Sequence, residues 1–414
     1  MQGPHLYTLM STRSPENGFV STWKTDNVGT SNDDQITLPL EASGDYDFTV
    51  WWGDDTKDKI TVWNQAEVTH TYPSAGTYTV SILGTINGWR FNMGGDRLKI
   101  LTIEKWSQLK LGNNQDYFYG CTQLQINATD IPDLSDTTDL SGLFTSCTGI
   151  TSLDIDDWDV SGVTNMSYSF QGCVSLTALD INSWDVSNVT NMTGTFRSLV
   201  GLTSLNVSSW DVSGVETFYR TFNGCTSLVT TDISLWDVGA SVSFKEMFRG
   251  CNAMTTLDVS GWDTSSVTNM SSMFFDCWDL TSVDVSLWDV GLVTNMDGMF
   301  LFCTSISNPD VSSWNTVSLG SAGFMFMESA VTSVAVDLWD ITSVAYLQDM
   351  FFNSDLTTAK YDQILLAWSI QLVLDSVMFG VASTKYTGGG AVAAARAVLV
   401  GAPNNWDISD GGTA

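Results

Sequence analysis

Basic residues and histidines are scarce in this sequence. Of the 414 residues, 16 are Lys or Arg and 46 are Asp or Glu, so the formal net charge at pH 7 is −30. A surface this acidic repels the phosphates of nucleic acids and anionic lipid headgroups, and we therefore expect neither as a partner. His5 and His70 are the only histidines, and no Gly-x-Ser-x-Gly motif or P-loop occurs. Without a nucleophile–base constellation, we expect no enzyme.

Long apolar runs are also missing. No stretch approaches the ~18 consecutive apolar residues of a membrane-spanning helix, so we expect no membrane span. The segment from Met1 to Tyr7 lacks the basic region and apolar run of a signal peptide. We expect the protein either to have lost a leader or to reach the outside by another route, such as release of phage particles by lysis.

The sequence does contain a strict repeat of 26 residues. Tryptophan recurs at positions 158, 184, 210, 236, 262, 288 and 314, and then at 339 after a one-residue deletion. Phenylalanine keeps the same step from 118 to 326, and all seven cysteines fall in one column of the repeat. Leu199 replaces the missing member of that column. A fixed period of this length is typical of a solenoid of stacked units.

Each unit predicts a strand, a turn and a second short element. The segment Leu179-Asp180-Ile181 alternates like a strand, with the two apolar side chains inward and the aspartate outward. Met192 and Phe196 lie four residues apart, which predicts a short helix or 3₁₀ segment. One unit cannot bury its apolar face alone, but a stack of units can.

The unit Trp-Asp-Val-Ser-x-Val-Thr-Asn-Met, continued by Met-Phe-x-x-Cys-x-x-Leu-Thr-x-Leu-Asp-Val, resembles the BspA-type leucine-rich repeats (DUF285). The resemblance covers roughly residues 99–357. It implies a surface-exposed adhesion or recognition module, of the kind found in bacterial surface proteins and phage-encoded proteins, and it implies no enzymatic activity. It supplies no fixed ligand-binding residues.

The flanking segments differ from the repeat. Residues 18–98 contain short alternating runs separated by turn residues, which predicts a β-sandwich. Their Trp-Gly-Asp motif at 52–54 and His-x-Tyr-x-x-x-Gly-x-Tyr motif at 70–78 are similar to those of polycystic-kidney-disease-type (PKD) domains, which implies a spacer or adhesion module. We interpret residues 1–17 as an N-terminal arm.

Residues 358–414 show helical and strand patterns, and we expect them to cap the open end of the solenoid. The expected fold class is therefore β-rich (α+β): an N-terminal β-sandwich, a leucine-rich-repeat solenoid over residues 99–357 and a mixed α/β C-terminal cap.

The cysteine and tryptophan columns each allow two interpretations. We expect the cysteines to be reduced and buried, because Leu199 in the same column can serve only packing. Neighbouring rungs ~4.8 Å apart would also permit a disulfide, whereas the absence of a Cys-x-x-Cys motif argues against zinc. We expect the tryptophans in the core, although aromatic rows can form sugar-binding platforms.

Two columns of aspartate recur. One follows the tryptophans and is expected to cap turns by accepting backbone N–H groups. The other is expected to point outward from the strands and is the candidate binding surface: Asp154, Asp180, Asp232, Asp258, Asp284 and Asp310. Asn206 fills one gap in it. This outward column is either a solvated face or a ladder of oxygen ligands for a cation such as Ca²⁺, and no other cofactor is expected.

These observations predict a non-enzymatic phage virion surface protein, on the tail or the capsid exterior, that recognises or adheres to its host through the solenoid. The expected partners are a host cell-surface glycan or protein and, through the N-terminal region, other virion proteins, with several copies on each particle. The alternatives are a secreted bacterial surface adhesin and a purely structural capsid decoration or head fibre.

Overall fold

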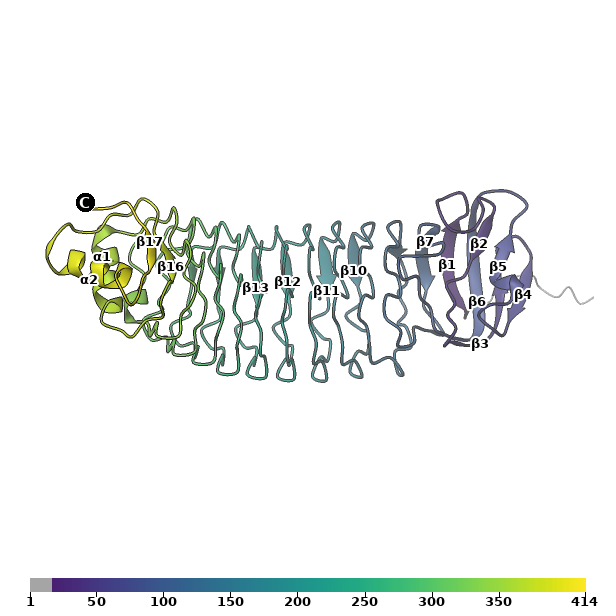
Figure 1. The fold of residues 1–414 in the computed structure, drawn as a ribbon. Coiled ribbons are helices and arrows are strands. Elements are labelled where there is room, and N and C mark those ends of the chain that lie inside the picture. Colours follow the sequence, from purple (N-terminus) through teal and green to yellow (C-terminus); the bar gives the residue numbers. More distant parts are fainter. Residues whose placement is uncertain (1–16) are drawn as a thin grey trace, which may run out of the picture. The chain divides into compact units, whose positions relative to one another are not determined.

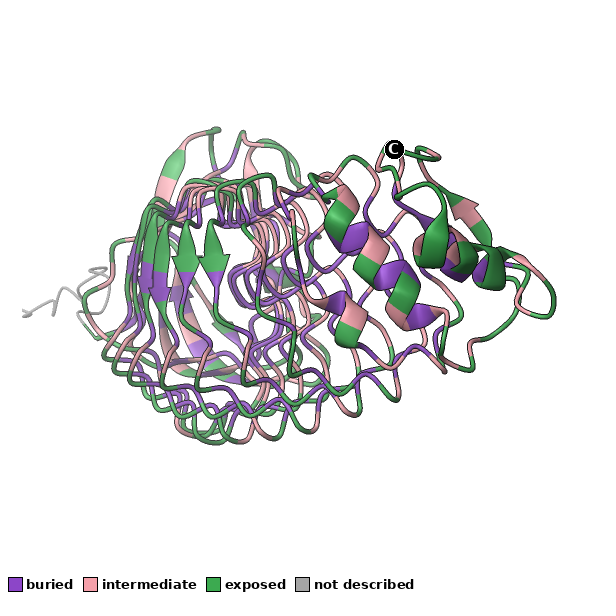
Figure 2. Cartoon of the chain, turned by 90° about the vertical axis from the view of Figure 1, so that its left-hand side faces the viewer, coloured by how far each residue is buried: buried purple, intermediate pink, exposed green. Residues whose placement is uncertain are grey.

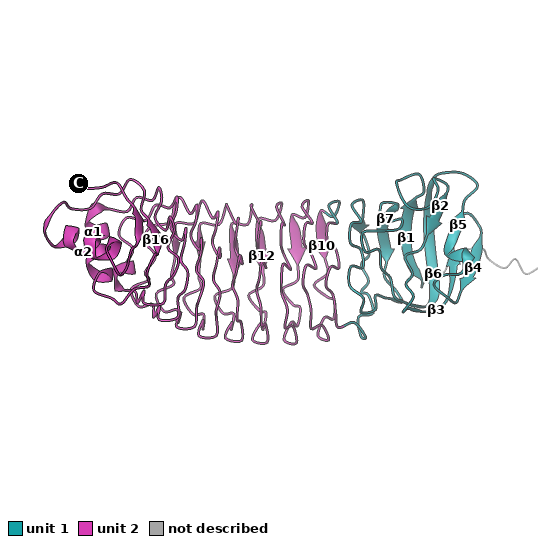
Figure 3. Cartoon of the chain, viewed as in Figure 1, with its two compact units in different colours: residues 1–137, 147–150 teal, residues 138–146, 151–414 magenta. Residues whose placement is uncertain are grey.

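The computed structural model describes residues 17–414, and the expected arm of residues 1–17 lies outside them except for Asn17. The chain is β-rich, and its two α-helices lie near the C-terminus, which confirms the expected fold class (Figure 1). Contacts divide the chain into two compact units (Figure 3). Unit 1 runs to Thr137 and includes Cys147–Ile150, and unit 2 comprises residues 138–146 and 151–414. Among the described residues, no helix is both long and apolar enough to cross a membrane.

Unit 1 contains one large sheet and one small sheet. The large sheet has the order β4-β3-β6-β1-β7-β9, with β8 pairing β6, and the small sheet pairs β2 with β5. Alternating apolar residues point from the large sheet into the core, among them Phe19, Trp23 and Phe48. The elements are β1 (Phe19–Lys24), β2 (Gln35–Thr37), β3 (Asp45–Trp51), β4 (Lys57–Ile60), η1 (Ala66–Val68), β5 (Thr69–Thr71), β6 (Thr77–Asn87), β7 (Ile100–Lys105), β8 (Leu109–Lys110) and β9 (Gln125–Ile126).

The division between the units corrects the boundary expected at residue 98. Strand β7, expected as the first turn of a separate solenoid, pairs antiparallel with β1 and parallel with β9. The first solenoid turn therefore completes the N-terminal sheet, and the contacts separate only after Thr137. Removing β7 would leave β1 with unpaired N–H and C=O groups along one edge.

Two buried charged side chains, Lys99 and Asp96, fix one loop of unit 1. The Lys99 ammonium is fully buried and donates to the carbonyls of Ser31, Asn32 and Gln35 and to the Ser31 hydroxyl, at 2.7–3.2 Å. The equally buried Asp96 carboxylate accepts the amide N–H groups of Ser31 and Thr37. Each charge is thus satisfied by several hydrogen bonds, as a buried ion requires.

Unit 2 repeats short parallel strands whose central side chain is buried and whose flanking side chains are exposed (Figure 2). In one repeat Leu179 and Ile181 are buried and Asp180 is exposed, which confirms the alternation predicted from the sequence. The strands are β10 (Ser152–Asp154), β11 (Ala178–Asp180), β12 (Ser204–Asn206), β13 (Thr230–Asp232), β14 (Thr256–Leu257) and β15 (Ser282–Val283), and η2 (Val336–Leu338) follows.

The short helix predicted at Met192–Phe196 is wrong. Alternate amides of this segment donate to the next turn of the solenoid: Gly194 N–H to the Tyr219 carbonyl at 2.9 Å and Phe196 N–H to the Thr221 carbonyl at 2.9 Å. The amides between them close β-turns within the segment. Gly194 and Ser198 have φ near +60°, and this left-handed backbone turns alternate amides toward the neighbouring unit. The four-residue spacing thus reflects successive turns.

The tryptophan column lies in the core, as expected, and adds a hydrogen bond that packing alone does not require. From Trp184 to Trp339, each indole N–H of the column donates to a carbonyl 28 or 29 residues earlier, as in the pair Trp236 to Val207 at 3.1 Å. The same bond joins Trp184 to Ile155, Trp210 to Ile181, Trp262 to Ile233, Trp288 to Val259, Trp314 to Val285 and Trp339 to Val311. A buried indole therefore finds its partner one turn back.

The phenylalanine column forms a second continuous stack. Neighbouring rings from Phe170 to Phe351 lie nearly parallel, with centroids 5.3–6.0 Å apart. Because a ring in one turn packs on the ring of the next, the apolar core is continuous along unit 2.

All seven cysteines are reduced and buried, as predicted. Each thiol from Cys225 to Cys303 donates to a phenylalanine carbonyl 29 residues earlier, at 2.9–3.2 Å. Burial raises the pKa of Cys225 and of Cys277 to about 12. These thiols therefore stay protonated at neutral pH, which makes them poor nucleophiles.

The helical and strand patterns of residues 358–414 correspond to two helices and two strands. They are α1 (Thr358–Trp368), β16 (Met378–Gly380), α2 (Gly390–Val400) and β17 (Asp407–Ser409). The Trp368 indole N–H donates to the Val336 carbonyl, and Phe379 forms a parallel bridge with Leu347. The segment thus continues the hydrogen bonding of the last turns.

Trp236→Phe should lower the free energy of unfolding by about 2 kcal/mol, because it removes a buried hydrogen bond and leaves a cavity. Trp278→Phe, at an indole that is half exposed, is the matched control and should leave that free energy nearly unchanged. Urea unfolding followed by circular dichroism measures both. Equal effects of the two substitutions would contradict the structural role of the indole bond.

The cysteines should resist a thiol reagent such as DTNB in the native protein and react fully in guanidinium chloride. The reason is their complete burial and raised pKa values. Rapid native labelling of several thiols per chain would show that the column is accessible.

Candidate functional site

The outward face of the unit 2 strands is polar and repeats in register. Ser152 lies beside Ala178, and Asp154 beside Asp180, in one parallel pair. Asn206 lies beside Asp232 in another. Each strand thus presents a short side chain and then a carboxylate or amide, at the ~4.8 Å spacing of adjacent strands.

All six predicted aspartates are exposed: Asp154, Asp180 and Asp232 end their strands, Asp258 and Asp284 directly follow β14 and β15, and Asp310 holds the same repeat position outside any strand. We call them the outward Asp column: Asp154, Asp180, Asp232, Asp258, Asp284 and Asp310. The register brings the first two side by side, whereas Asn206 separates Asp180 from Asp232. Charge repulsion from Asp310 acts on Asp284, as expected for like charges on successive turns.

Four members of the column are held by the serine two residues later. Asp284 Oδ1 accepts the Ser286 amide at 3.0 Å and its hydroxyl at 2.7 Å. These bonds, the hydroxyl first, lower the pKa of Asp284, and the matching Ser312 bonds lower the pKa of Asp310. Asn206 makes the same pair of bonds with Ser208. The carboxylates are therefore oriented, with one oxygen engaged in the turn.

The second aspartate column caps turns, as expected. Asp159, Asp211 and Asp263 each accept the amide N–H of the serine two residues later, at 3.0–3.1 Å. The serine hydroxyl bonds, followed by these amide bonds, lower the pKa of all three carboxyls. This column serves the local backbone.

A metal site is not evident at the outward Asp column. Among residues 17–414, no three His, Cys, Asp or Glu side chains lie close enough together to hold a metal ion. Ca²⁺ takes six to eight oxygen ligands, and one oxygen of Asp232, Asp258, Asp284 and Asp310 already accepts from a serine.

One cluster was missed by the sequence analysis. Between Lys110 and Lys360 the sequence contains only four basic residues: Arg197, Arg220, Lys245 and Arg249. All four belong to the turn segments that follow the tryptophans. Counting basic residues along the chain would have found them, because they fall in three successive units.

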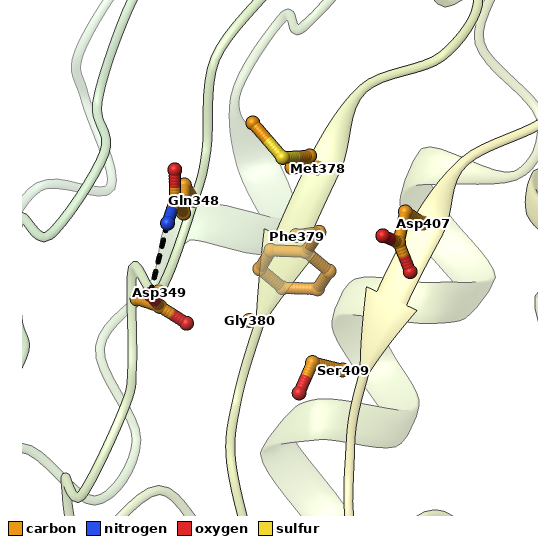
Figure 4. Close-up of a pocket in the computed structure, with 7 residues that line it drawn as sticks. All are labelled: Gln348, Asp349, Met378, Phe379, Gly380, Asp407 and Ser409. Atoms are coloured by element: carbon orange, nitrogen blue, oxygen red, sulfur yellow. Dashed lines mark hydrogen bonds between the residues drawn. The ribbon is translucent and has the colours of Figure 1, made fainter.

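A small cavity of about 150 Å³ lies where the last turn meets β16 and β17 (Figure 4). Asp349 and Asp407 lie on opposite sides of β16, and Gln348 donates to Asp349 at 3.3 Å. Its lining residues are Gln348, Asp349, Met378, Phe379, Gly380, Asp407 and Ser409. The two carboxylates make the cavity negatively charged, like the chain as a whole.

Three overlapping segments, residues 95–198, 138–257 and 242–368, match a family described as Mycoplasma protein of unknown function, DUF285. Together they span well over half of the chain. The chain belongs to the DUF285 family. The resemblance to leucine-rich repeats of this type is thereby confirmed over the predicted solenoid.

Solved structures of leucine-rich-repeat proteins are also similar. A protein from Bacteroides ovatus is 11% identical, with 79% of this chain and 95% of that chain covered, at a TM-score of 0.26. The functional domain of InlJ from Listeria monocytogenes, which includes a cysteine ladder, is 13% identical, with 81% and 76% covered, at a TM-score of 0.19. No curated protein matches this DUF285 protein.

Replacing Asp159, Asp211 and Asp263 together by Asn should lower the Tm at pH 6, because a neutral amide oxygen accepts hydrogen bonds more weakly than a carboxylate. The folded-state pKa values lie below the unfolded value of about 3.9, so the carboxylates stabilise the fold above pH ~4. That stabilisation is lost as the pH falls through the folded values. The Tm difference between parent and variant should therefore close by about pH 2, as measured by thermal unfolding.

The charge-matched control replaces the exposed residues Glu216, Asp279 and Asp355 by their amides. It removes the same number of negative charges without touching a turn cap. A Tm at pH 6 that falls as much in the control would contradict the capping role.

Proposed function

We propose that this DUF285 protein is a non-enzymatic recognition protein of an outer surface, and that the polar strand face of unit 2 contacts its target. The observation that carries the proposal is the repetition of one oriented polar pattern, an exposed short side chain followed by an exposed Asp or Asn, in register on successive strands. Such a face offers many similar contacts in a row, each individually weak.

Packing supports this proposal. The residues between the exposed side chains, such as Leu179 and Leu205, are buried, and the serine bonds hold Asp232 and Asp284 in fixed orientations. A surface whose side chains are already ordered loses little entropy on binding.

We further propose a phage virion as the location, on the tail or the capsid exterior, with a host cell-surface glycan or protein as the target. The resemblance to BspA-type repeats supports this, because such repeats occur in phage-encoded proteins as well as in bacterial surface proteins. The alternatives are a secreted bacterial adhesin and a structural capsid decoration. If the protein is a virion component, the N-terminal region contacts other virion proteins, and several copies decorate each particle.

We also propose that the N-terminal region is a PKD-like domain. The residues of the two motifs form one cluster: the His70 ring stacks on Trp52 with centroids 4.7 Å apart, and Tyr72 stacks on Tyr78 at 3.8 Å. His70 Nε2 also contacts Asp54 at 2.8 Å. Motif residues that support one another in this way suit a spacer domain.

The test uses the full chain, fluorescently labelled, and a panel of intact bacterial cells. Replacing Asp232, Asp258 and Asp284 together by Asn should weaken cell binding at least tenfold, because the charges are lost while each serine keeps its acceptor. Asn206 makes those serine bonds in the parent protein, so the variant should fold normally. The Glu216, Asp279 and Asp355 amide variant is the control and should bind like the parent.

Equal binding by the parent and the strand-face variant would leave the outward Asp column as a solvated face. Absence of cell binding by the parent would overturn recognition and favour structural decoration. Mass spectrometry of purified particles from the source strain tests the virion location separately, since a secreted adhesin would be found in particle-free medium.

A further inference from the structure

We propose that the four basic residues of unit 2 and the aromatic rings beside them form a binding ridge for an anionic polysaccharide. The basic ridge consists of Arg197, Tyr219, Arg220, Lys245, Arg249 and Phe275. The proposal deepens the recognition function by naming a ligand class, and it rests on that function only for its biological setting. The ridge lies on the turn segments and not on the strand face.

The distribution of charge is the first observation. The chain carries a net charge of −30, yet the only basic residues in the 249 positions between Lys110 and Lys360 gather in three successive repeats. Arg197 and Arg249 occupy the same position of the repeat, two turns apart, which places them roughly 10 Å apart along the axis at ~4.8 Å per turn. A regular polymer with spaced negative charges can match such a row.

The second observation is how the ridge is held together. Arg220 donates to the Glu246 carboxylate from Nε at 2.8 Å and from Nη2 at 3.2 Å, and Arg249 Nη1 lies 3.6 Å from the same carboxylate. The Glu246 side chain is only 8% exposed. One buried carboxylate thus fixes two guanidinium groups, and the ridge keeps an excess of positive charge.

Aromatic rings lie directly beside the charges. The Arg220 guanidinium lies 4.7 Å from the Tyr219 ring centroid, the Lys245 ammonium 5.8 Å from the same ring, and the Arg249 guanidinium 4.3 Å from Phe275. These are cation–π distances. Flat rings and guanidinium planes suit the C–H faces of sugar rings, and guanidinium forks suit carboxylates or sulfates.

Two of the four cations have no salt-bridge partner among the described residues. Within residues 17–414, Arg197 and Lys245 form no salt bridge, and the Arg197 Nε has no hydrogen-bond partner. A guanidinium with an unmet donor is costly to hold in a partly buried place, and an anionic ligand would supply the charge that is missing.

A single polyanionic strand fits the ridge better than an acidic protein does. The chain as a whole carries a net charge of −30, and its exposed carboxylates far outnumber the four cations of the ridge. A broad acidic protein surface would meet these charges and be repelled, whereas a linear polymer can follow the ridge alone.

The experiment uses the full chain and polygalacturonate oligomers, titrated by isothermal calorimetry at low salt. The ridge variant is Arg197→Gln, Lys245→Gln and Arg249→Gln, which keeps Arg220 as the partner of buried Glu246. The charge-matched control is Lys57→Gln, Lys59→Gln and Lys385→Gln, all exposed and outside the ridge. Thermal unfolding checks that both variants fold.

We expect the parent to bind, the ridge variant to bind at least tenfold more weakly, and the control to bind within threefold of the parent. Neutral dextran should not bind. Dextran sulfate replaces carboxylate by sulfate, so tighter binding of either polymer identifies which anion the ridge prefers.

Three outcomes overturn the proposal: no binding by the parent to either anionic polymer, equal losses in the ridge and control variants, or tighter binding of polyglutamate than of both polysaccharides, which would indicate an acidic protein partner. The titration uses a purified polymer and not cells. If the polymer does not bind, the proposal of recognition through the strand face still stands. Conversely, if the parent protein does not bind cells, the titration still tests whether the ridge binds an anionic polysaccharide.

Discussion

Hydrogen bonds that pass from one 26-residue turn to the next determine the rest of unit 2. The Phe196 amide, the Trp236 indole and the Cys225 thiol each find a partner one turn away, and none could be satisfied within its own turn. An insertion within a turn segment would displace its donors from their acceptors, whereas the one-residue deletion before Trp339 keeps the indole bond, at a separation of 28 instead of 29 residues. The strict period is therefore a requirement of the backbone and the core together, and it explains why the surface side chains also repeat in register.

Side-chain patterns predicted the architecture where inward and outward positions alternate. Leu179, Ile181 and Asp180 were assigned correctly, and so were the elements of the C-terminal segment. The segment after Met192 was assigned incorrectly. Its left-handed residues, Gly194 and Ser198, stand four positions apart, so its apolar side chains repeat every four residues just as they would in a helix. Only the direction of the amides distinguishes the two, and a side-chain pattern carries no information about it.

Of the two candidate binding surfaces, one could be predicted from the sequence and the other could not. The outward Asp column could be predicted because one strand position defines it, although the serine bonds that orient Asp284 needed the folded turn. The basic ridge could not be predicted from a single column, because Arg197, Arg220 and Lys245 hold different positions in their repeats. They become neighbours only when the turns stack. The pairing of β7 with β1 could not be predicted from the repeat pattern either, because it joins a repeat to a strand outside the repeats.

Amide hydrogen exchange tests this account most directly, because it measures the bonds on which the surface depends. Peptides covering residues 191–199, 217–225 and 243–251 should exchange at least ~100-fold more slowly than an unstructured chain, at rates comparable to those of the strand segments in the same turns. Exchange of these turn segments at nearly unprotected rates, with the strands still protected, would contradict the inter-turn hydrogen bonds as the constraint that orders unit 2.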